Sequence, residues 1–305
     1  MNNASYEKNR LKRVLQSPVL FVVPYATLFI IIIALPVLAA LVLSFTSFNT
    51  IQAPEFVFLQ NYVDLITGDA VFLQKALSNT LLFSLIVGPI GYIMSFGLAW
   101  MLAQVPHKAR TFYAVVIYSP SITGPIMMAN VWRVIFSGDE TGHLNNFLLN
   151  TLGIIDSPFQ YLQDADWLFG IMIVVSLWSS MGLGFLAMLA GVLNIDRSLY
   201  EAAAIDGMKN RWQEIFYITI PSMKPQMLFG AVMAIIGTFN SAGLASALAG
   251  GTAPPQYSGW LIVDHANDFG FTRFEMGYAS AVTVILLLVV VFFNQISYRL
   301  FGERD

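Results

Sequence analysis

The chain of 305 residues contains no cysteine and only three histidines. The absence of cysteine excludes disulfide bridges, thiolate nucleophiles and cysteine-based metal sites. The histidines, His107, His143 and His265, fall in three different loops and lack the HExxH spacing of zinc proteases. We therefore expect solvated loop histidines and no metal site.

Motifs of common enzyme classes are also missing. The sequence has no GxxxxGK[ST] loop, which cradles nucleotide phosphates, and no GxSxG nucleophile elbow. The chain is therefore predicted not to be an enzyme. In particular, it is not expected to hydrolyse ATP on its own by means of a phosphate-binding loop of this type.

Charge is scarce along the chain. Charged residues form 11% of it, hydrophobic residues form 57%, and the mean hydropathy is +0.68, whereas a soluble domain carries roughly 25% charged residues. Asp, Glu, Lys and Arg are absent from six long segments, each above the roughly 20 residues that a helix needs to cross a bilayer. These segments are 14–54, 76–107, 111–132, 167–195, 225–263 and 276–298.

The sequence therefore predicts an all-α integral membrane protein with a single transmembrane domain over 18–300. Its six membrane helices are expected at about 18–45, 77–103, 111–135, 167–193, 226–248 and 277–300. The first is too long for the apolar part of a cleaved signal peptide, so we expect it to remain as a helix. Segments 1–17 and 301–305 are expected to be a cytoplasmic N-terminal segment and a cytoplasmic tail.

The distribution of basic residues predicts this orientation. All of the 15 Lys and Arg except Lys75, Arg133 and Arg273 fall at the termini, in the loop after the second helix, or in loop 196–225. Acidic residues such as Asp139 prevail in the opposite loops. The positive-inside rule then places both termini and loop 196–225 in the cytoplasm.

The predicted membrane helices hold almost no ionisable residue. Proton- and sodium-driven carriers usually place Asp, Glu or His within the membrane, so the energy for transport is expected to come from a partner. One alternative is a secondary transporter or channel independent of ATP, because backbone groups alone can bind sodium. Another is a membrane-embedded enzyme. Dependence on ATP and on a partner ATPase separates these readings.

The last cytoplasmic loop concentrates the charges of the chain. Ser198 and Glu201 form the S-x-x-E pattern of a capping box, which predicts a short helix from about Leu199. Gly207 suits the left-handed position that follows a helix. A second helical stretch comes next and is expected to stop at Pro221. A short exposed rod beneath the membrane is suited to contact with another protein.

The run EAAAIDG at 201–207, followed by Phe216, Ile218, Ile220, Pro221 and Pro225, resembles the EAA loop of bacterial ABC-importer permeases. Further runs resemble the carbohydrate-uptake branch of that family, similar to the maltose and glycerol-3-phosphate permeases. They are NYVDLI at 61–66, ALSNTLLF at 76–83, YSPSITGPIMMANVWRVIF at 118–136, LNNFLLNTLGI at 144–154, LWSSMGLGFLAMLAGVLNID at 177–196 and MGYASAVTVI at 276–285. The run LAGGTAPP at 248–255 departs from the LTGGGP of the family.

The resemblance implies a type I ABC-importer permease of the bacterial inner membrane, with a cytoplasmic coupling helix that docks into an ATPase. The residues that would carry this coupling are Glu201, Ala202, Ala203, Asp206 and Gly207. The competing interpretation for Glu201 is a helix cap alone. Implied partners are a second, related permease subunit in a heterodimer, two cytoplasmic ABC ATPase subunits and an extracytoplasmic solute-binding protein. ATP and Mg would be bound by the ATPases, and this chain is expected to hold no cofactor.

The nearly uncharged helices favour a neutral, hydroxyl-rich substrate, a sugar or oligosaccharide, because a buried charged ligand calls for an opposite charge. Candidate contacts are neutral residues in or beside the helices: Tyr118, Asn130, Trp178, Gly182, Asn240 and Ser241. The resemblance carries sugar contacts to Asn240 and to the vicinity of Gly182. The alternative for Asn240 is a hydrogen bond between helices, and the alternative for Trp178 is packing.

Proline and glycine within the helices predict points of bending. These points are Pro24, Pro36, 88–91, Pro120, Gly124–Pro125, Gly182, Gly184, Gly237 and Gly243. Both residue types are also common in straight membrane helices.

The outer loops offer candidate contacts for the binding protein. Segment 142–156 reads as an amphipathic helix at the outer surface, and 249–276 is long enough to dip toward the pore or form a docking surface. Arg133 is expected to pair with Asp139 and Glu140, with contact to an acidic sugar as the alternative.

Overall fold

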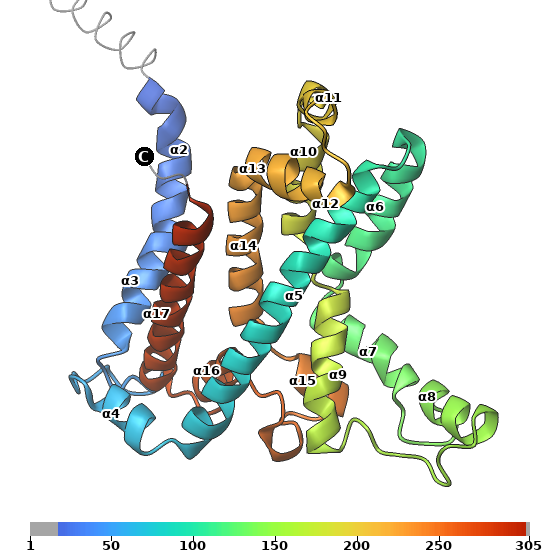
Figure 1. Ribbon diagram of the computed structural model, residues 1–305. Helices are drawn as coiled ribbons and strands as arrows, with labels where there is room; N and C mark the ends of the chain where they lie inside the picture. Colours follow the sequence, from blue (N-terminus) through green and yellow to red (C-terminus); the bar gives the residue numbers. More distant parts are fainter. Residues whose placement is uncertain (1–17, 303–305) are drawn as a thin grey trace, which may run out of the picture.

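The computed structural model describes residues 18–302, and its regular secondary structure in that range is helical (Figure 1). Within these residues extended pairing is limited to one antiparallel bridge between Thr46 and Phe56. The prediction of an all-α chain is confirmed. The predicted cytoplasmic segment 1–17 and residues 303–305 of the predicted tail lie outside the described residues.

The helices follow one another along the chain with several π-helical and 3-10 turns between them. Their order is α2 (Pro18–Phe29), η1 (Ile30–Ala34), α3 (Leu35–Leu43), α4 (Gln60–Thr67), η2 (Phe72–Ala76), α5 (Leu77–Ala103), α6 (His107–Ile122), α7 (Pro125–Ile135), α8 (His143–Asn146), η3 (Phe147–Thr151), α9 (Ala165–Trp178), α10 (Leu183–Leu193), α11 (Arg197–Ile205), α12 (Arg211–Glu214), η4 (Ile215–Thr219), α13 (Ile220–Ser222), α14 (Lys224–Phe239), α15 (Leu244–Ala249), η5 (Pro255–Tyr257), α16 (Ile262–Asn267), η6 (Asp268–Thr272) and α17 (Met276–Phe301).

Four helical stretches are long and apolar enough to cross a membrane: Val22–Leu43, Phe72–Ala103, Ala165–Leu193 and Met276–Leu300. The pair α6 and α7 makes a fifth if it is counted as one broken span, and α14 is apolar but shorter. The chain is thus multi-pass by length and composition, with four to five spans in residues 18–302. The six-span count stays a prediction.

Three of the predicted helices, 111–135, 226–248 and 167–193, are interrupted in the structure and are not continuous. The first bends by 100° between α6 and α7, where Thr123 and Gly124 are extended. Pro125 disfavours a helical conformation in the residue before it, which explains this break. The second break separates α14 from α15 at Gly243, whose φ is +77°. Such left-handed backbone is readily adopted by glycine.

A third interruption lies within the predicted span 167–193, between Trp178 of α9 and Leu183 of α10. Gly182 has φ −92° and ψ −143° there. By contrast, α5 runs without a break through Pro89, so the predicted bend at 88–91 does not interrupt the helix. The breaks therefore fall at three of the predicted points, Gly124–Pro125, Gly182 and Gly243, and α5 continues as a helix through the predicted point at 88–91.

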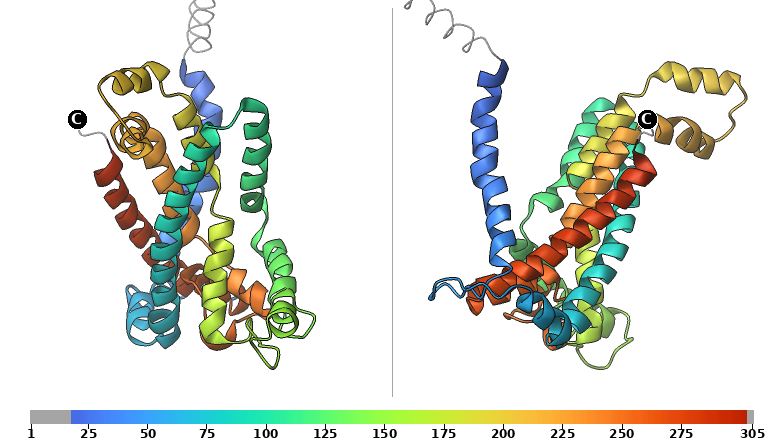
Figure 2. Two further views of the ribbon diagram at one scale, coloured as in Figure 1. Left: turned by 45° about the vertical axis from the view of Figure 1, so that its right-hand side comes forward. Right: turned by 90° about the vertical axis from the view of Figure 1, so that its left-hand side faces the viewer.

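The first helical rod exposes large apolar side chains along its length. Leu28, Ile32 and Leu38 are 58%, 64% and 61% exposed. Exposed apolar surface of this extent is costly in water, and it matches a helix whose outer face is in contact with lipid. α3 lies beside the start of α17 (Figure 1), whereas α2 diverges from α17 toward the other end of the bundle (Figure 2).

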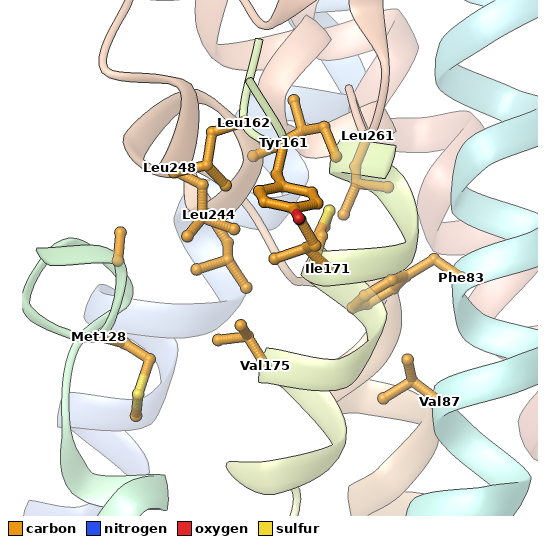
Figure 3. Packing of buried hydrophobic residues seen from close by; sticks show 14 residues of the cluster. Phe83, Val87, Met128, Tyr161, Leu162, Ile171, Val175, Leu244, Leu248 and Leu261 are labelled. Carbon is orange, nitrogen blue, oxygen red and sulfur yellow. The ribbon is translucent and has the colours of Figure 1, made fainter. Parts of the chain in front are cut away.

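Three clusters of buried apolar residues hold the other helices together. The first joins α5, α7, α9 and α15 through residues such as Phe83, Met128, Val175 and Leu248 (Figure 3). The second joins α5, α10 and α14, and the third joins η2, α14, α16 and α17. Since α5 and α14 contribute to two clusters each, they form the centre of the bundle.

Small residues let α10 and α14 approach closely. A Cβ added at Gly184 would lie 3.3 Å from the Cα atom of Gly230, and one added at Gly230 would lie 2.5 Å from Cε of Met188. Contacts of this kind are typical of membrane helices, where small residues bring backbones together.

The two ends of the bundle differ in their loops. α11 lies at the end where α2 begins and α17 finishes, and it projects away from the bundle (Figures 1 and 2). The opposite end carries α4, α8, α15 and α16 (Figure 1). The segment predicted as an amphipathic surface helix, 142–156, is helical over α8 and η3 at this second end. There, Leu144 and Leu148 pack against the first apolar cluster.

Candidate functional site

A cavity of about 300 Å³ lies where the three helix breaks meet. Its walls come from α5, the α6–α7 bend, the α9–α10 break and the region from α14 to the start of α15. The lining residues are Phe83, Val87, Gly88, Gly91, Tyr92, Ser95, Ser121, Thr123, Pro125, Met128, Ser176, Ser179, Ser180, Gly182, Leu183, Gly184, Met188, Gly230, Met233, Ala234, Gly237, Thr238, Ser241 and Leu244. Irregular backbone at membrane depth is tolerated where it lines a cavity, which fits this arrangement.

The cavity wall is mostly apolar, with several hydroxyl-bearing residues and, within residues 18–302, no charged residue. Its lining includes no Asp, Glu, Lys, Arg or His among the described residues. The lining combines serines such as Ser179, Ser180 and Ser241 with apolar and aromatic residues such as Phe83 and Tyr92. Hydroxyls both donate and accept hydrogen bonds, and aromatic surface covers the apolar side of a ligand. The cavity can thus receive a neutral molecule that carries many hydroxyl groups.

Gly182 and Ser241, two of the candidate substrate contacts, line this cavity. Asn240 directly precedes Ser241 and is exposed, and its Nδ2 donates a hydrogen bond to the carbonyl oxygen of Ile236 at 3.0 Å. Asn240 therefore bonds to its own helix within the described chain, and it is not among the residues that line the cavity. Its role in substrate binding stays a prediction.

Three other candidate contacts lie away from the cavity lining. Tyr118 is half-buried on α6, one turn before Ser121. Trp178 packs edge to face against Trp132, with the ring centroids 5.4 Å apart. Asn130 lies on α7 beside Arg133, in a separate depression of about 390 Å³. The structure thus brings two of the six candidates together in one cavity and places one more beside it.

Arg133 does not pair with Asp139 or Glu140 as predicted. Within residues 18–302, no ion pair joins them. Oδ1 of Asp139 instead accepts hydrogen bonds from the backbone N–H groups of Thr141 and Gly142 and from the Thr141 hydroxyl, at 3.0, 2.9 and 2.7 Å. The Asp139 carboxylate, which was predicted to pair with Arg133, therefore forms hydrogen bonds within its own turn instead.

Sequence analysis missed the serines of the α9–α10 break. Ser179 and Ser180 both line the cavity, and the Ser180 hydroxyl donates to the carbonyl oxygen of Leu177 at 2.7 Å. The available signal was the pair of serines just before Met181 and Gly182, in the middle of an otherwise apolar span. Polar residues followed by glycine at that depth mark a broken helix.

The helix predicted in the loop between α10 and α14 is α11, but its start was predicted two residues too late. Asp196 is the N-cap, and its carboxylate accepts a hydrogen bond from the N–H of Ser198 at 2.9 Å. The predicted capping box of Ser198 and Glu201 is therefore wrong. Asp preceding the first helical residue competes for the same backbone N–H groups and takes this position.

The end of α11 is as predicted. Gly207 has φ +90°, the N–H of Gly207 donates to the carbonyl oxygen of Ala204 at 3.3 Å, and that of Met208 donates to Ala203 at 3.0 Å. These two bonds form a Schellman motif, which requires a left-handed residue at this position. Glycine adopts it without the strain that a side chain would bring.

α11 has no buried residue among the described neighbours. Glu201 and Ala202 are exposed, Ala203 is half-buried, and Ile205 is 87% exposed. Within residues 18–302, the Glu201 carboxylate makes no hydrogen bond or ion pair. Nothing in the described part of the chain therefore accounts for the charge at Glu201 or for the exposed apolar side chain of Ile205.

The outer loop segment predicted at 249–276 folds back onto the bundle through α16. His265 is 3% exposed, so its assignment as a solvated histidine was wrong. Its Nε2 lies 2.8 Å from Oδ2 of Asp69, which also accepts a hydrogen bond from the Tyr278 hydroxyl at 2.7 Å. The rings of Phe72 and Phe269 flank the imidazole. This cluster connects three segments that are far apart in the sequence.

The charges of this cluster follow from burial. Burial lowers the pKa of His265 below 6.5, against the opposing influence of the Asp69 carboxylate. Partial burial of Asp69 raises its pKa, but hydrogen bonds from the Phe72 N–H and the Tyr278 hydroxyl outweigh this, so the pKa is lowered. At neutral pH the pair is therefore a neutral imidazole that donates to a carboxylate.

Acidification is expected to destabilise this end of the molecule. The folded protein binds a proton at His265 less readily than the unfolded chain does, so the contribution to stability is present above pH 6.5 and is lost as the pH falls below it. The melting temperature of the purified complex should fall between pH 7 and pH 5. In His265→Gln, whose amide can donate to Asp69 without titrating, the fall should be smaller. An equal fall in both proteins would contradict this origin of the pH dependence.

Comparison with known proteins identifies the family. The sequence profile described as "Binding-protein-dependent transport system inner membrane component" matches residues 88–304, most of the chain. The chain belongs to this family. It is accordingly a multi-pass inner-membrane transport component, which agrees with the apolar helices of the structure.

Relatives of this transport family match almost the whole chain. The probable ABC transporter permease protein YesP of Bacillus subtilis is 32% identical over 92% of this chain and 88% of its own length. The lactose transport system permease protein LacF of Rhizobium radiobacter is 31% identical, with coverage of 93% and 94%. The arabinooligosaccharides transport system permease protein AraP of Bacillus subtilis is 29% identical, with coverage of 94% and 89%.

A solved structure shares the fold of this family member. It is a bacterial alginate ABC transporter in complex with an alginate pentasaccharide-bound periplasmic protein. One of its chains superimposes with a TM-score of 0.73 at 21% identity, covering 98% of this chain and 99% of that chain. This likeness supports the type I ABC-importer permease fold that the sequence predicts.

Proposed function

We propose that this chain is the translocation subunit of an ATP-driven importer for a neutral sugar or oligosaccharide. The observation that carries the proposal is the uncharged, hydroxyl-lined cavity at the meeting point of three helix breaks. Its volume of about 300 Å³ is at the lower end of the roughly 300–1,000 Å³ of small-molecule sites. Lactose and arabinooligosaccharides, the substrates in the names of two relatives, are neutral and rich in hydroxyls.

Charge decides the substrate class. A phosphate or carboxylate held in the cavity would need a compensating cation, because an unpaired charge at membrane depth is costly. Other relatives are named for glycerol-3-phosphate and sulfoquinovosyl glycerol, which are anionic. The cavity of this chain presents serine, threonine and tyrosine hydroxyls where such a ligand would require arginine or lysine.

The coupling element in this proposal is α11. This helix would dock into a cytoplasmic ATPase. The contacts would come from the exposed Glu201 and Ala202, the half-buried Ala203, and Asp206 and Gly207 at the end of the helix. Support comes from the exposure of the helix and its projection beyond the bundle (Figure 2). The end that carries α11 would then be cytoplasmic, together with both termini, as the positive-inside rule predicts.

The proposed complex contains more than this chain. One coupling helix engages one ATPase, and two ATPases are needed to enclose ATP, so a second permease subunit would complete a heterodimer. A solute-binding protein would deliver the sugar from the outer side. ATP and the loaded binding protein would both favour the outward-facing state, so each would promote the action of the other. The ATPases, with their ATP and Mg, supply the chemistry.

The test is the ATPase activity of the assembled complex with its binding protein. Neutral oligosaccharides are expected to stimulate ATP hydrolysis in the presence of the binding protein, and uronic-acid or phosphorylated sugars of the same length are not. Stimulation restricted to anionic sugars would contradict the proposed substrate class. Stimulation by no sugar, with an ATPase that does not co-purify, would contradict the importer itself.

A further inference from the structure

Asp264 is a buried carboxylate in α16, with 7% of its surface exposed. Its two oxygen atoms accept hydrogen bonds from two different parts of the chain. Oδ1 accepts from the N–H of Gly243 at 2.6 Å, and Oδ2 accepts from the N–H of Leu261 at 3.0 Å. Within residues 18–302, no cation pairs with it. A buried carboxylate without a cation is costly, so its two backbone partners are what keep it in place.

The first of these bonds reaches the wall of the cavity. Gly243 ends the short turn between α14 and α15 and takes the left-handed conformation there, with φ +77°. Ser241, two residues earlier, and Leu244, the next residue, both line the cavity. The bond from Asp264 therefore fixes the turn between α14 and α15 beside the cavity.

The segment that carries Asp264 is itself attached to a second wall of the cavity, α5. Nδ2 of Asn79 donates to the carbonyl oxygens of Tyr257 and Trp260 at 3.0 and 3.1 Å. The Thr80 hydroxyl accepts from the N–H of Ile262 at 2.9 Å. Asn79 and Thr80 belong to α5, the helix whose next turns line the cavity with Phe83, Val87 and Gly88.

These contacts make segment 257–265 a link between two cavity walls. Asn79 and Thr80 bind residues 257–262 to α5, and Asp264 binds the turn at Gly243. Only a carboxylate offers one acceptor oxygen to each of two N–H groups, because an amide has a single acceptor oxygen. If the side chain only capped the helix at the N–H of Leu261, a single acceptor oxygen would be enough and a carboxylate would not be needed.

We propose that Asp264 is a positioning residue for translocation: by holding the Gly243 turn, it fixes Ser241 at the cavity wall at the distance from α5 that the substrate requires. This inference rests on the proposed function of the cavity. It assigns to the segment 257–265 a role in the shape of the cavity, in addition to any contact with a binding protein. A variant without the carboxylate frees the turn while α5 stays in place.

The absence of cysteine from the chain allows a test that does not depend on transport. Ser241→Cys places one thiol on the turn, and Ser179→Cys places a control thiol on the α9–α10 break, which Asp264 does not contact. Each is labelled with a small water-soluble maleimide in membranes that contain the assembled complex. Asp264→Ala is expected to raise the labelling rate of Ser241→Cys roughly tenfold, a loss equivalent to one buried hydrogen bond. The rate at Ser179→Cys should stay unchanged.

Asp264→Asn keeps one acceptor oxygen, so its labelling rate is expected to fall between those of wild type and Asp264→Ala. Asp268→Ala is the matched control, since Asp268 lies in the same outer segment and forms an exposed ion pair with Arg273. It should leave the labelling rate unchanged. Unchanged labelling at Ser241→Cys in Asp264→Ala would overturn the proposal, and so would an equal rise at Ser179→Cys, because that result indicates general loosening.

Uptake of sugar by the same complexes separates this inference from the function on which it rests. Asp264→Ala is expected to lower the rate of sugar uptake per assembled complex about tenfold, with the ATPase activity measured without binding protein unchanged. Wild-type uptake together with normal uptake in Asp264→Ala would overturn the positioning role alone. Absence of ATP-driven uptake in wild type would overturn the proposed function, and the labelling rates would still report whether Asp264 holds the turn.

Discussion

Glu201→Lys is expected to release the partner ATPase from the membrane complex while the permease still inserts into the membrane. Glu201 is exposed on α11 and has no partner in residues 18–302, and its backbone is not the start of the helix, because Asp196 provides the cap. Charge reversal therefore leaves α11 folded and changes only what docks on it. Recovery of the ATPase with the purified permease should fall at least about tenfold, which corresponds to about 1.4 kcal/mol.

Glu275→Lys provides the matched control for this prediction. It is the same chemical change at an exposed residue at the start of α17, at the opposite end of the bundle from α11. It should leave ATPase recovery unchanged. Ala203→Trp should act like Glu201→Lys, because a large side chain on the docking helix prevents close approach. Full recovery of the ATPase with both α11 variants would contradict the assignment of α11 as the coupling helix.

Gly237→Leu is expected to block sugar uptake without disturbing the fold. Gly237 lines the cavity from α14, and a Cβ added there meets no atom within 4 Å. The leucine side chain therefore enters open space and occupies part of the volume of about 300 Å³ that the substrate needs. Uptake should fall at least about tenfold, as measured with radiolabelled sugar in proteoliposomes.

Gly170→Leu controls for the helix itself. Gly170 lies in α9, is exposed and likewise has no atom within 4 Å of an added Cβ, but it does not line the cavity. Leucine is a better helix former than glycine in both places. Normal uptake in Gly170→Leu with loss in Gly237→Leu assigns the effect to the cavity. Normal uptake in both would show that the substrate passes elsewhere.

The membrane class and the helices were predictable because they depend on local composition. Charge-free segments above the length of a bilayer mark α5 and α17 almost to the residue, at 77–103 and 277–300. Gly207 was predictable for a related reason, since a left-handed helix end favours glycine whatever surrounds it. These features require no knowledge of what lies next to them in space.

The cavity was predictable only in part because it is formed at helix breaks. Gly182 and Ser241 were found, but the bend before Pro125 and the serines at 179 and 180 were not assigned to one site. Their meeting depends on how α6, α9 and α14 pack, which no window of sequence contains. A charge-free segment looks the same whether the helix is continuous or broken.

The buried polar contacts were unpredictable for the same reason. His265 is next to Asp69, 196 positions away along the chain, only because α16 folds back onto η2 and the residues before it. Likewise Asp264 reads as an ordinary loop residue until its distance to the Gly243 N–H is known. Sequence analysis assigned His265 to solvent, because polar residues in loops are solvated by default, and it made no prediction for Asp264.

The most direct test of the central claim is sugar uptake into proteoliposomes that contain this chain with its second permease subunit and ATPases. Loaded binding protein is added outside, and ATP is enclosed inside. We predict that a neutral oligosaccharide accumulates inside only when both ATP and binding protein are present, and that Glu201→Lys abolishes accumulation. Uptake that proceeds at the same rate without ATP would contradict the account and favour a channel or secondary transporter.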